Sequence, residues 1–429
     1  MEETQQNDQK MEFRALCEEF RANNQIPPEK FDLYQVKRGL RNPDGTGVMA
    51  GLTLICNVHG YLIDDAERIP DKGILTYRGI NVEDIVEGCR RENRFGFEEV
   101  AWLLLFGKQP TRSQLEGFSK LLNSCRELPE YFAEDMIIKA PSRNIMNKLG
   151  RSVLALYSYD DNPDDPSLEN NMRQAIQLIA RLPTIMTYAY QVKRRHFDRQ
   201  SMFFHPLDPN HSTAEAILNA IRPDRVFTDE EAKLLDLCLM LHADHGGGNN
   251  STFTNHVVTS SGTDTYSAIA ASMASLKGPR HGGANSKVMA MMDDVKEHVR
   301  DWNDEGCVAD YLTRILNKDA FDRSGLIYGL GHAVYTKTDP RCEVFRAYVN
   351  HLAAEKGRED ELALYANVEK IGKQLLMERQ HKSVLSTNID FYSGFVYSML
   401  DLPMELYTPI FAIARIAGWS AHRMEELTG

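Results

Sequence analysis

Apolar residues recur at helical spacing along most of this 429-residue chain, and this periodicity is the strongest constraint on its fold. One apolar stripe runs from Met172 to Leu182, and the following Pro183 is expected to end or kink that helix. The segment Thr228-Asp229-Glu230-Glu231 has the pattern of a capping box and predicts the start of another helix. The sequence contains no internal repeat, low-complexity tract or flexible linker that would mark a simple domain boundary.

Strand-prone residues are confined to two short runs near the N-terminus. Leu52 to Cys56 and Gly73 to Tyr77 are rich in β-formers and are bounded by Gly, Asp or Asn. The sequence therefore predicts an all-α fold with a small N-terminal β patch, in which any second domain is an insertion.

Composition disfavours several classes of partner and location. The net charge of −12 opposes general binding to nucleic acid or anionic membranes, so local arginines must bind any anionic ligand. The mean hydropathy of −0.41 and the lack of a long uncharged apolar run predict no membrane span. Met1 to Lys10 lacks a targeting pattern, and the seven scattered cysteines form no CxxC pair that would indicate a zinc site. We therefore expect a cytoplasmic protein.

A helix stop, a histidine and a helix start fall within Gly278-Pro279-Arg280-His281-Gly282-Gly283-Ala284-Asn285. The preceding run, Ser267 to Lys277, is typical of a tightly packed helix, and a second helix is expected to begin near Gly283. His281 would lie at the entrance of that second helix, where the positive end of the dipole disfavours imidazolium. A neutral histidine in this place suits donation of a hydrogen bond to a substrate carbonyl.

His242 and His245 are three residues apart, and a metal pair is one interpretation of this spacing. The general-base glutamate of an HExxH pattern is missing, and no third ligand is near in sequence. A capping or core role is favoured over a metal site. A ligand-binding role is favoured further, because Gly246-Gly247-Gly248 follows.

His332 follows Gly329 and Gly331, whose spacing indicates a loop with backbone conformations that other residues rarely adopt. This spacing lacks the third glycine and the strand of a dinucleotide fingerprint. Alone, His332 would most often be structural. Arg341, nine residues on, is a candidate clamp for a carboxylate.

Two charged residues stand in apolar surroundings near the C-terminus. Asp390 lies between Ile389 and Phe391, where burial would raise its pKa toward that of a working general base; a helix N-cap is the equal alternative. Arg415 is the only charge in an apolar run and needs an anionic partner. That partner is either a distant acid or a substrate carboxylate, and the absence of a local acid favours the substrate.

Read in order, four segments closely resemble the signature segments of the citrate synthase family, which includes 2-methylcitrate synthases: GPRHGGAN, GLGHAVYTKTDPR, NIDFYSG and FAIARIAGWSAH. Weaker similarity extends over residues 50–429. The resemblance implies a nearly all-helical homodimer whose small domain closes over the site. That small domain would be residues 283–391, inserted between residues 1–282 and 392–429 of the large domain, with residues 1–50 as an N-terminal extension.

The resemblance also implies a role for each candidate residue. His281 would donate to the acetyl-CoA carbonyl, and Asp390 would remove a proton from its methyl group. His332 would polarise the keto carbonyl of oxaloacetate and protonate the new alkoxide. The remaining residues would bind oxaloacetate (His245, Arg341 and Arg415) or meet CoA through the loop backbone (Leu330 and Gly331). Hydrolysis of citryl-CoA would then yield citrate, without a cofactor or a metal.

Some features depart from the family pattern and bear on substrate choice. Arg280 stands where the family often has an apolar residue, and Gly246-Gly247-Gly248 differs from the commoner sequence. Many members carry a further arginine that reaches the partner's site, and the sequence ends at Gly429 before one. Use of propionyl-CoA to make 2-methylcitrate is the nearest alternative, since one methylene in the acyl pocket is worth only ~1 to 3 kcal/mol. An inactive helical scaffold and a metal-dependent hydrolase that uses His242 and His245 are the other hypotheses.

Overall fold

The computed structural model describes residues 29 and 33 and residues 51–64, 67–279 and 281–428. The chain divides into two units, Met1–Val48 and Met49–Gly429, and all helices and strands named below belong to the second. Apart from residues 29 and 33, the predicted N-terminal extension lies outside the described residues, and so does Arg280.

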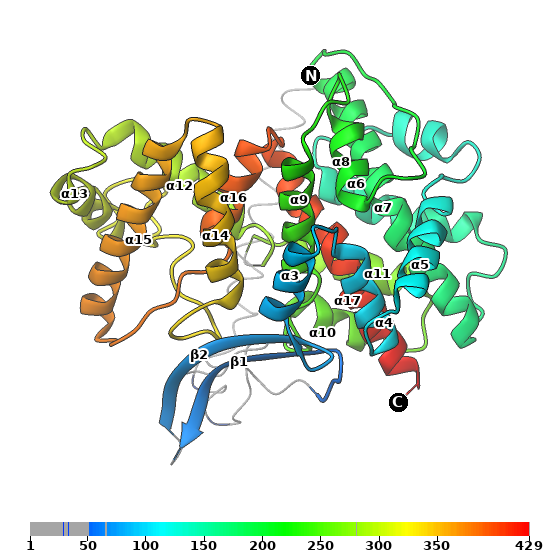
Figure 1. The fold of residues 1–429 in the computed structure, drawn as a ribbon, viewed down its shortest axis with the longest axis horizontal. Helices are drawn as coiled ribbons and strands as arrows, with labels where there is room; N and C mark the ends of the chain where they lie inside the picture. The colour runs from blue at the N-terminus through cyan, green and yellow to red at the C-terminus, as the bar shows by residue number, and fades with distance from the viewer. Residues whose placement is uncertain (1–28, 30–32, 34–50, 65–66, 280, 429) are drawn as a thin grey trace, which may run out of the picture. The chain divides into compact units, whose positions relative to one another are not determined.

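The second unit is mostly helical, which confirms the predicted fold class (Figure 1). Its α-helices are α3 (Val82–Arg91), α4 (Phe97–Phe106), α5 (Arg112–Ser124), α6 (Ile145–Leu156), α7 (Leu168–Phe197), α8 (Thr213–Ile221), α9 (Asp229–His242), α10 (Asn250–Thr259), α11 (Thr265–Leu276), α12 (Ala284–His298), α13 (Glu305–Leu316), α14 (Pro340–Glu355), α15 (Glu359–Gln380), α16 (Asp390–Met399) and α17 (Tyr407–Thr428). Short turns of other helix types are η1 (Ala133–Ile138), η2 (Tyr157–Tyr159) and η3 (Met404–Leu406).

The described residues form one small antiparallel sheet, in the order β1 (Cys56–Asp64), β2 (Glu67–Tyr77) and β3 (Ile80–Asn81). The predicted strand at Gly73 to Tyr77 lies within β2. The predicted strand at Leu52 to Cys56 is wrong except for its last residue. Leu52 and Leu54 are 94% and 80% exposed, whereas the ladder begins where buried Cys56 pairs with buried Tyr77. A strand forms where it pairs with a neighbouring strand, and the β-propensity of a segment alone does not provide that neighbour.

Local sequence signals at Thr228 and Pro183 predicted two helix boundaries, and the structure agrees with the first. α9 begins after Thr228, whose side chain and Glu231 form the predicted capping box. α7 continues through Pro183 instead of ending there. Pro183 and its neighbours Leu182 and Thr184 are buried, so the packing of this long helix outweighs one missing hydrogen bond.

α17 is the helix around which the large group of helices packs, and it contacts α4, α6, α7, α9, α10 and α11 (Figure 1). The helix is buried from Ala412 to Met424. Gly418 allows the close approach of α17 to the segment that follows α9. A Cβ at this position would lie 2.1 Å from Asp244 Oδ2 and 2.5 Å from the Ala243 carbonyl oxygen.

Helices α12 to α16 form a second group of contacts. α13 and α14 pack against α15, and α16 packs against α12 and α14. α14 also contacts α3 and β2, and α12 contacts α17. The assignment of residues 283–391 to a separate closing domain stays a prediction. Within the described residues, no helix has the length and apolar character needed to cross a membrane.

Candidate active site

Arg415 stands near the middle of α17 and is fully buried. Its Nε–H donates to the carbonyl oxygen of His242 at 2.7 Å, and its guanidinium carbon lies 4.6 Å from the ring centroid of Phe411. Nη1 and Nη2 have no hydrogen-bond partner, and no acid forms an ion pair with Arg415, among the described residues. Burial lowers the pKa of Arg415, and Asp244 is the group that most opposes this effect. Two unused donors on a buried cation favour an anionic ligand over a distant acid.

His245 lies just beyond α9, next to two other aromatic rings. Its ring centroid is 5.2 Å from that of His332 and 5.5 Å from that of Tyr335. Its Nε2 is inaccessible to solvent and has no partner within the described part of the chain. Burial, followed by the charges of Arg341, His332 and Arg415, holds the pKa of His245 well below its ordinary value. His245 is therefore a neutral ring with an unsatisfied nitrogen, which suits ligand binding.

The backbone fixes the tautomer of His332. Its Nδ1 accepts hydrogen bonds from the backbone N–H groups of Val334 at 3.0 Å and Tyr335 at 3.1 Å. An Nδ1 that accepts two hydrogen bonds cannot carry a proton, so the proton of the neutral ring is on Nε2. His332 is thus oriented as a hydrogen-bond donor.

The loop that carries His332 depends on its glycines and on a neighbouring segment. Gly329 has a φ of 82°, and a Cβ there would lie 2.9 Å from Phe391 Cδ2. The Gly331 N–H donates to the Ser386 carbonyl at 2.7 Å, and the Asn388 N–H donates to the Gly329 carbonyl at 2.9 Å. This pairing joins the loop to the segment that leads into Asp390.

The small sheet supports the other side of the same loop. Nη2 of Arg68, on β2, donates to the carbonyl oxygens of Ala333 at 2.9 Å and Val334 at 3.1 Å. The Thr336 hydroxyl donates to the Gly60 carbonyl on β1. The sheet therefore helps to position His332, a role that the sequence did not indicate.

His281 occupies the turn between α11 and α12, as predicted. Its Nε2 lies 3.0 Å from Ser251 Oγ and accepts a hydrogen bond from the Ser251 N–H at 3.3 Å. The Ser251 hydroxyl also accepts from Trp419 Nε1–H at 3.1 Å. Because a backbone N–H faces Nε2, the ring proton is on Nδ1.

The lowered pKa of His281 agrees with the predicted neutral state, whereas the predicted effect of the α12 dipole stays a prediction. Burial, followed by the charge of Arg415, lowers the pKa of His281 to about 4. The helix N-terminus that its Nε2 meets is that of α10, where Ser251 is the second residue, and not that of α12. The sequence predicted a position at the start of the neighbouring helix α12, whereas the folded chain places His281 Nε2 against the start of the more distant helix α10.

Asp390 is the first residue of α16, and its side chain does not cap that helix. This excludes the N-cap alternative. Burial raises the pKa of Asp390 to about 6, with Asp339 adding to the rise and Arg341 and Arg415 opposing it. The carboxyl group accepts no hydrogen bond from the described residues, which leaves it available to accept a proton.

Arg341 differs from the simple clamp that the sequence suggested. Its Nε and Nη2 donate to the Oδ1 and Oδ2 of Asp339, at 3.0 and 2.7 Å, and both residues are buried. Asp339 also caps α14 and accepts from the N–H of Ile389 at 3.3 Å. The Asp-Pro pair at the start of α14 is a capping signal that could have identified Asp339.

The electrostatic effects of two arginines show which predicted residues lie together. Arg415 lowers the pKa of His281, His245 and Asp390. Arg341 does the same for His245 and Asp390. Five of the six predicted catalytic and oxoacid-binding residues thus share one electrostatic environment, and the sixth, His332, meets His245 ring to ring. A cavity of about 490 Å³ is lined by Leu330, Gly331 and His332, and His332 is the one of these six residues that lines it.

His242 has the core role that the sequence favoured over a metal pair with His245. Nδ1 of His242 donates to the Cys238 carbonyl at 2.8 Å, and burial lowers its pKa to about 3. His242 is therefore a core histidine whose carbonyl positions Arg415. The cluster with metal-ligating geometry in the described part of the chain is exposed and lies elsewhere, at Glu230, His351 and Glu355.

Comparison with known proteins gives one consistent result. The family model "Citrate synthase, C-terminal domain" matches residues 44–429. The chain is 35% identical to a citrate synthase of Synechocystis sp. over 83% of this chain and 82% of that protein. It is 31% identical to 2-methylcitrate synthase 1 of Corynebacterium glutamicum over 91% and 92% of the two chains.

Solved structures extend the comparison to three dimensions. The crystal structure of citrate synthase from Pyrobaculum aerophilum matches with a TM-score of 0.72 and 29% identity, over 91% of both chains. The ternary complex of carboxymethyl coenzyme A and oxaloacetate with citrate synthase from Thermoplasma acidophilum matches with a TM-score of 0.70 and 26% identity. That match covers 87% of this chain and 89% of the other.

Proposed function

The chain belongs to the citrate synthase family, and we propose that it condenses acetyl-CoA with oxaloacetate and hydrolyses citryl-CoA to citrate and CoA. Enzymes of this family transfer acyl groups and form citrate. The observation that carries the proposal is a buried Arg415 with two unused donor atoms, whose charge acts on a base, Asp390, and on a neutral donor, His281.

Oxaloacetate has two carboxylates and a keto carbonyl, and the described residues offer a partner for each kind of group. Nη1 and Nη2 of Arg415 would bind one carboxylate as a charge-assisted pair. Arg341 supplies a second positive charge, although Asp339 occupies two of its nitrogens. His332 would donate from Nε2 to the keto oxygen, and the neighbouring His245 would bind the oxoacid beside it.

Formation of the nucleophile requires removal of a proton from the acetyl methyl group. Asp390 is ionised at neutral pH because its pKa is about 6, and burial makes its carboxylate a stronger base than an exposed one. The proton passes from the methyl carbon to Asp390 while His281 donates from Nδ1 to the thioester oxygen. The product of this step is an enolate, whose oxygen accepts a hydrogen bond from the neutral His281.

Carbon–carbon bond formation then joins the enolate carbon to the keto carbon. The keto oxygen becomes an alkoxide and takes the proton of His332 Nε2, whose Nδ1 is kept an acceptor by two backbone N–H groups. The proton that Asp390 took from the methyl group is returned through water to His332, which restores both side chains. Water hydrolyses the thioester of citryl-CoA and releases CoA. The cavity lined by Leu330 and Gly331 adjoins His332 and would hold CoA. No step requires a cofactor or a metal.

The second candidate is 2-methylcitrate synthesis from propionyl-CoA. It is favoured by a specific observation, the presence of 2-methylcitrate synthases among relatives that cover nine tenths of the chain. The two substrates differ by one methylene. We further propose that the enzyme is a homodimer in the tricarboxylic acid cycle, as the resemblance implies, and that it is cytoplasmic, as the sequence composition leads us to expect.

Release of CoA thiol from the purified protein tests the proposed function. With oxaloacetate present, we expect thiol release from acetyl-CoA that exceeds release from propionyl-CoA, and none when oxaloacetate is omitted. Faster release from propionyl-CoA would transfer the assignment to 2-methylcitrate. Absence of release from both acyl-CoA substrates would refute the enzymatic function.

A further inference from the structure

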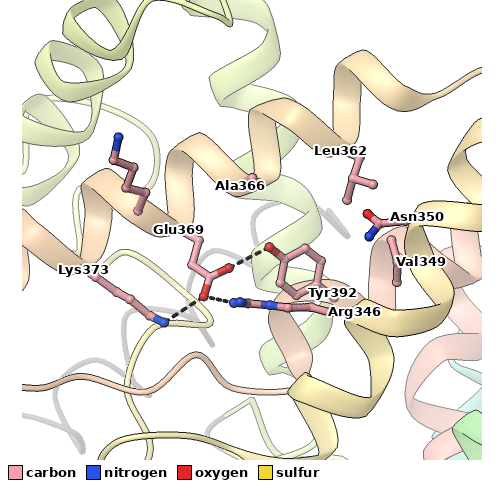
Figure 2. A pocket seen from close by; sticks show the side chains of 9 residues that line it. Arg346, Val349, Asn350, Leu362, Ala366, Glu369, Lys373 and Tyr392 are labelled. Atoms are coloured by element: carbon pink, nitrogen blue, oxygen red, sulfur yellow. Dashed lines mark hydrogen bonds and ion pairs between the residues drawn. The ribbon is translucent and has the colours of Figure 1, made fainter.

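Glu369 is a buried carboxylate on α15 that accepts hydrogen bonds from four side chains, three of which, Arg346, Lys373 and Tyr392, are drawn in Figure 2. Its side chain is 8% exposed. Lys373 Nζ lies 2.8 Å from Oε1, and the Tyr392 hydroxyl donates to Oε2 at 2.7 Å. Nη2 of Arg346 and the hydroxyl of Thr387 both donate to Oε1. This cluster of side chains has no part in the mechanism described above.

Two of the four donors flank the catalytic base in sequence. Thr387 stands three residues before Asp390, and Tyr392 stands two residues after it. One carboxylate therefore holds the chain on both sides of Asp390. The carboxyl group of Asp390 accepts no hydrogen bond among the described residues, so its position depends on how its backbone is held.

The other bonds of the same segment lead to the remaining site residues. Leu330 and Thr387 form an isolated β-bridge, next to the loop that carries His332. Arg346 lies on α14, whose first turn holds Arg341. Glu369 thus joins α14, α15 and α16 with the segment 386–388 at one point.

The alternative is that this ion cluster only stabilises the fold. The charge of Glu369 and the directed hydrogen bonds to it favour a positioning role instead. Burial raises the pKa of Glu369, but hydrogen bonds from Lys373, Thr387 and Tyr392 outweigh that effect and lower it. Glu369 is therefore ionised at neutral pH. Apolar residues often stabilise a fold as well as a buried ion pair does, whereas directed bonds to a charge fix the positions of their donors.

We propose that Glu369 is a positioning residue, whose carboxylate fixes the backbone on both sides of Asp390 so that the base meets the acyl methyl group. The inference rests on the proposed function and deepens it. A misplacement of about 1 Å at a reacting group can cost about 100-fold in rate. Loss of one hydrogen bond to Glu369 is accordingly expected to slow proton abstraction without a large effect on oxaloacetate binding.

Tyr392→Phe is the sharpest test, because it removes one hydroxyl and keeps the ring in place. Glu369→Gln is the second variant, and Glu361→Gln is the matched control. Glu361 lies on the same helix and pairs with Arg358 and Lys296, but it has no bond to the segments beside Asp390. The readouts are kcat with acetyl-CoA, the oxaloacetate Kd, and the isotope effect on kcat with methyl-deuterated acetyl-CoA.

We expect Tyr392→Phe and Glu369→Gln to lower kcat about 10-fold or more and to raise the isotope effect, with the oxaloacetate Kd within 2- to 3-fold of wild type. Glu361→Gln should match wild type in all three. A smaller folded fraction would lower kcat but leave the isotope effect unchanged. Tyr392→Phe decides the question if Glu369→Gln does not fold.

Two outcomes overturn the inference, and they are distinguishable. Wild-type thiol release together with an unchanged kcat or isotope effect in Tyr392→Phe refutes the positioning role alone. A wild-type protein without oxaloacetate-dependent thiol release refutes the proposed function, and the positioning role with it.

Discussion

Asp390 and His281 have pKa values that suit the opposite roles proposed for them at neutral pH. Burial raises the pKa of Asp390 to about 6 and lowers that of His281 to about 4. The same loss of solvent disfavours the charged form of both groups. Asp390 is nevertheless ionised at pH 7 and His281 neutral, which are the states that a base and a hydrogen-bond donor require.

The pH dependence of kcat/KM for oxaloacetate, at saturating acetyl-CoA, tests this assignment. Asp390 acts only when deprotonated, so the rate should rise through pH 6 and level off above pH 7. His281 stays neutral from pH 5 upward, so its titration should not add a second rise to the pH profile of kcat/KM in this range. A flat profile between pH 5 and 8, in a protein that stays folded over that range, would contradict the role of Asp390.

Much of the chemistry of single residues could be predicted from the sequence. The apolar neighbours of Asp390 and of Arg415 indicated that both side chains are buried. Burial is the largest cause of the rise in the pKa of Asp390 and of the fall in the pKa of Arg415. The partners could not be predicted, because they come from distant segments. Ser251 meets His281 from a helix 30 residues earlier, and nothing in its local sequence marks it.

Helix α17 depends on the small size of one residue where it passes the end of α9. Gly418→Ala would place a methyl group against Asp244 Oδ2 and the Ala243 carbonyl, so we expect the free energy of unfolding to fall by about 1 to 3 kcal/mol. Gly150→Ala is the matched control within α6, where a Cβ meets nothing within 4 Å. That control should raise stability by up to about 1 kcal/mol, since alanine favours helix.

Urea denaturation of both variants measures the two changes. Equal effects of Gly418→Ala and Gly150→Ala would show that the close approach of α17 to Asp244 has no energetic consequence. Opposite signs are expected, because only one of the two glycines is required by packing.

The elements that the sequence predicted well are those whose signals are local. The capping box at Thr228 and the stop at Gly278-Pro279 depend on neighbouring residues, and both helix ends agree with the structure. A helix end at Pro183, one of the two outcomes predicted there, and the first strand are not found, because both depend on contacts with distant residues. α7 continues through Pro183 because other helices bury it. β1 begins only after Leu52 to Ile55, because its pairing with β2 starts at Cys56.

The complete site exists only in the folded chain, because its residues come from segments between His245 and Arg415. Loop pairing, the small sheet and α17 bring these segments together, and no local pattern predicts such contacts. The order of four signature segments identified the family in advance, and the predicted site residues also follow from that resemblance. The grouping of α12 to α16 into a closing domain, and the roles of individual residues, stay predictions.

The central claim is that Asp390 removes the proton and Arg415 binds oxaloacetate. Comparing turnover with oxaloacetate binding in the same variants distinguishes these two roles. Oxaloacetate-dependent release of CoA thiol from acetyl-CoA is measured for wild type, Asp390→Asn and Arg415→Gln, alongside the oxaloacetate Kd. Asp390→Asn should lower turnover by roughly 100- to 10,000-fold with little change in Kd, and it should stay folded because it removes a buried charge. Arg415→Gln should raise the Kd roughly 10- to 100-fold. Wild-type turnover by Asp390→Asn, or equal losses of binding and turnover in both variants, would contradict this mechanism.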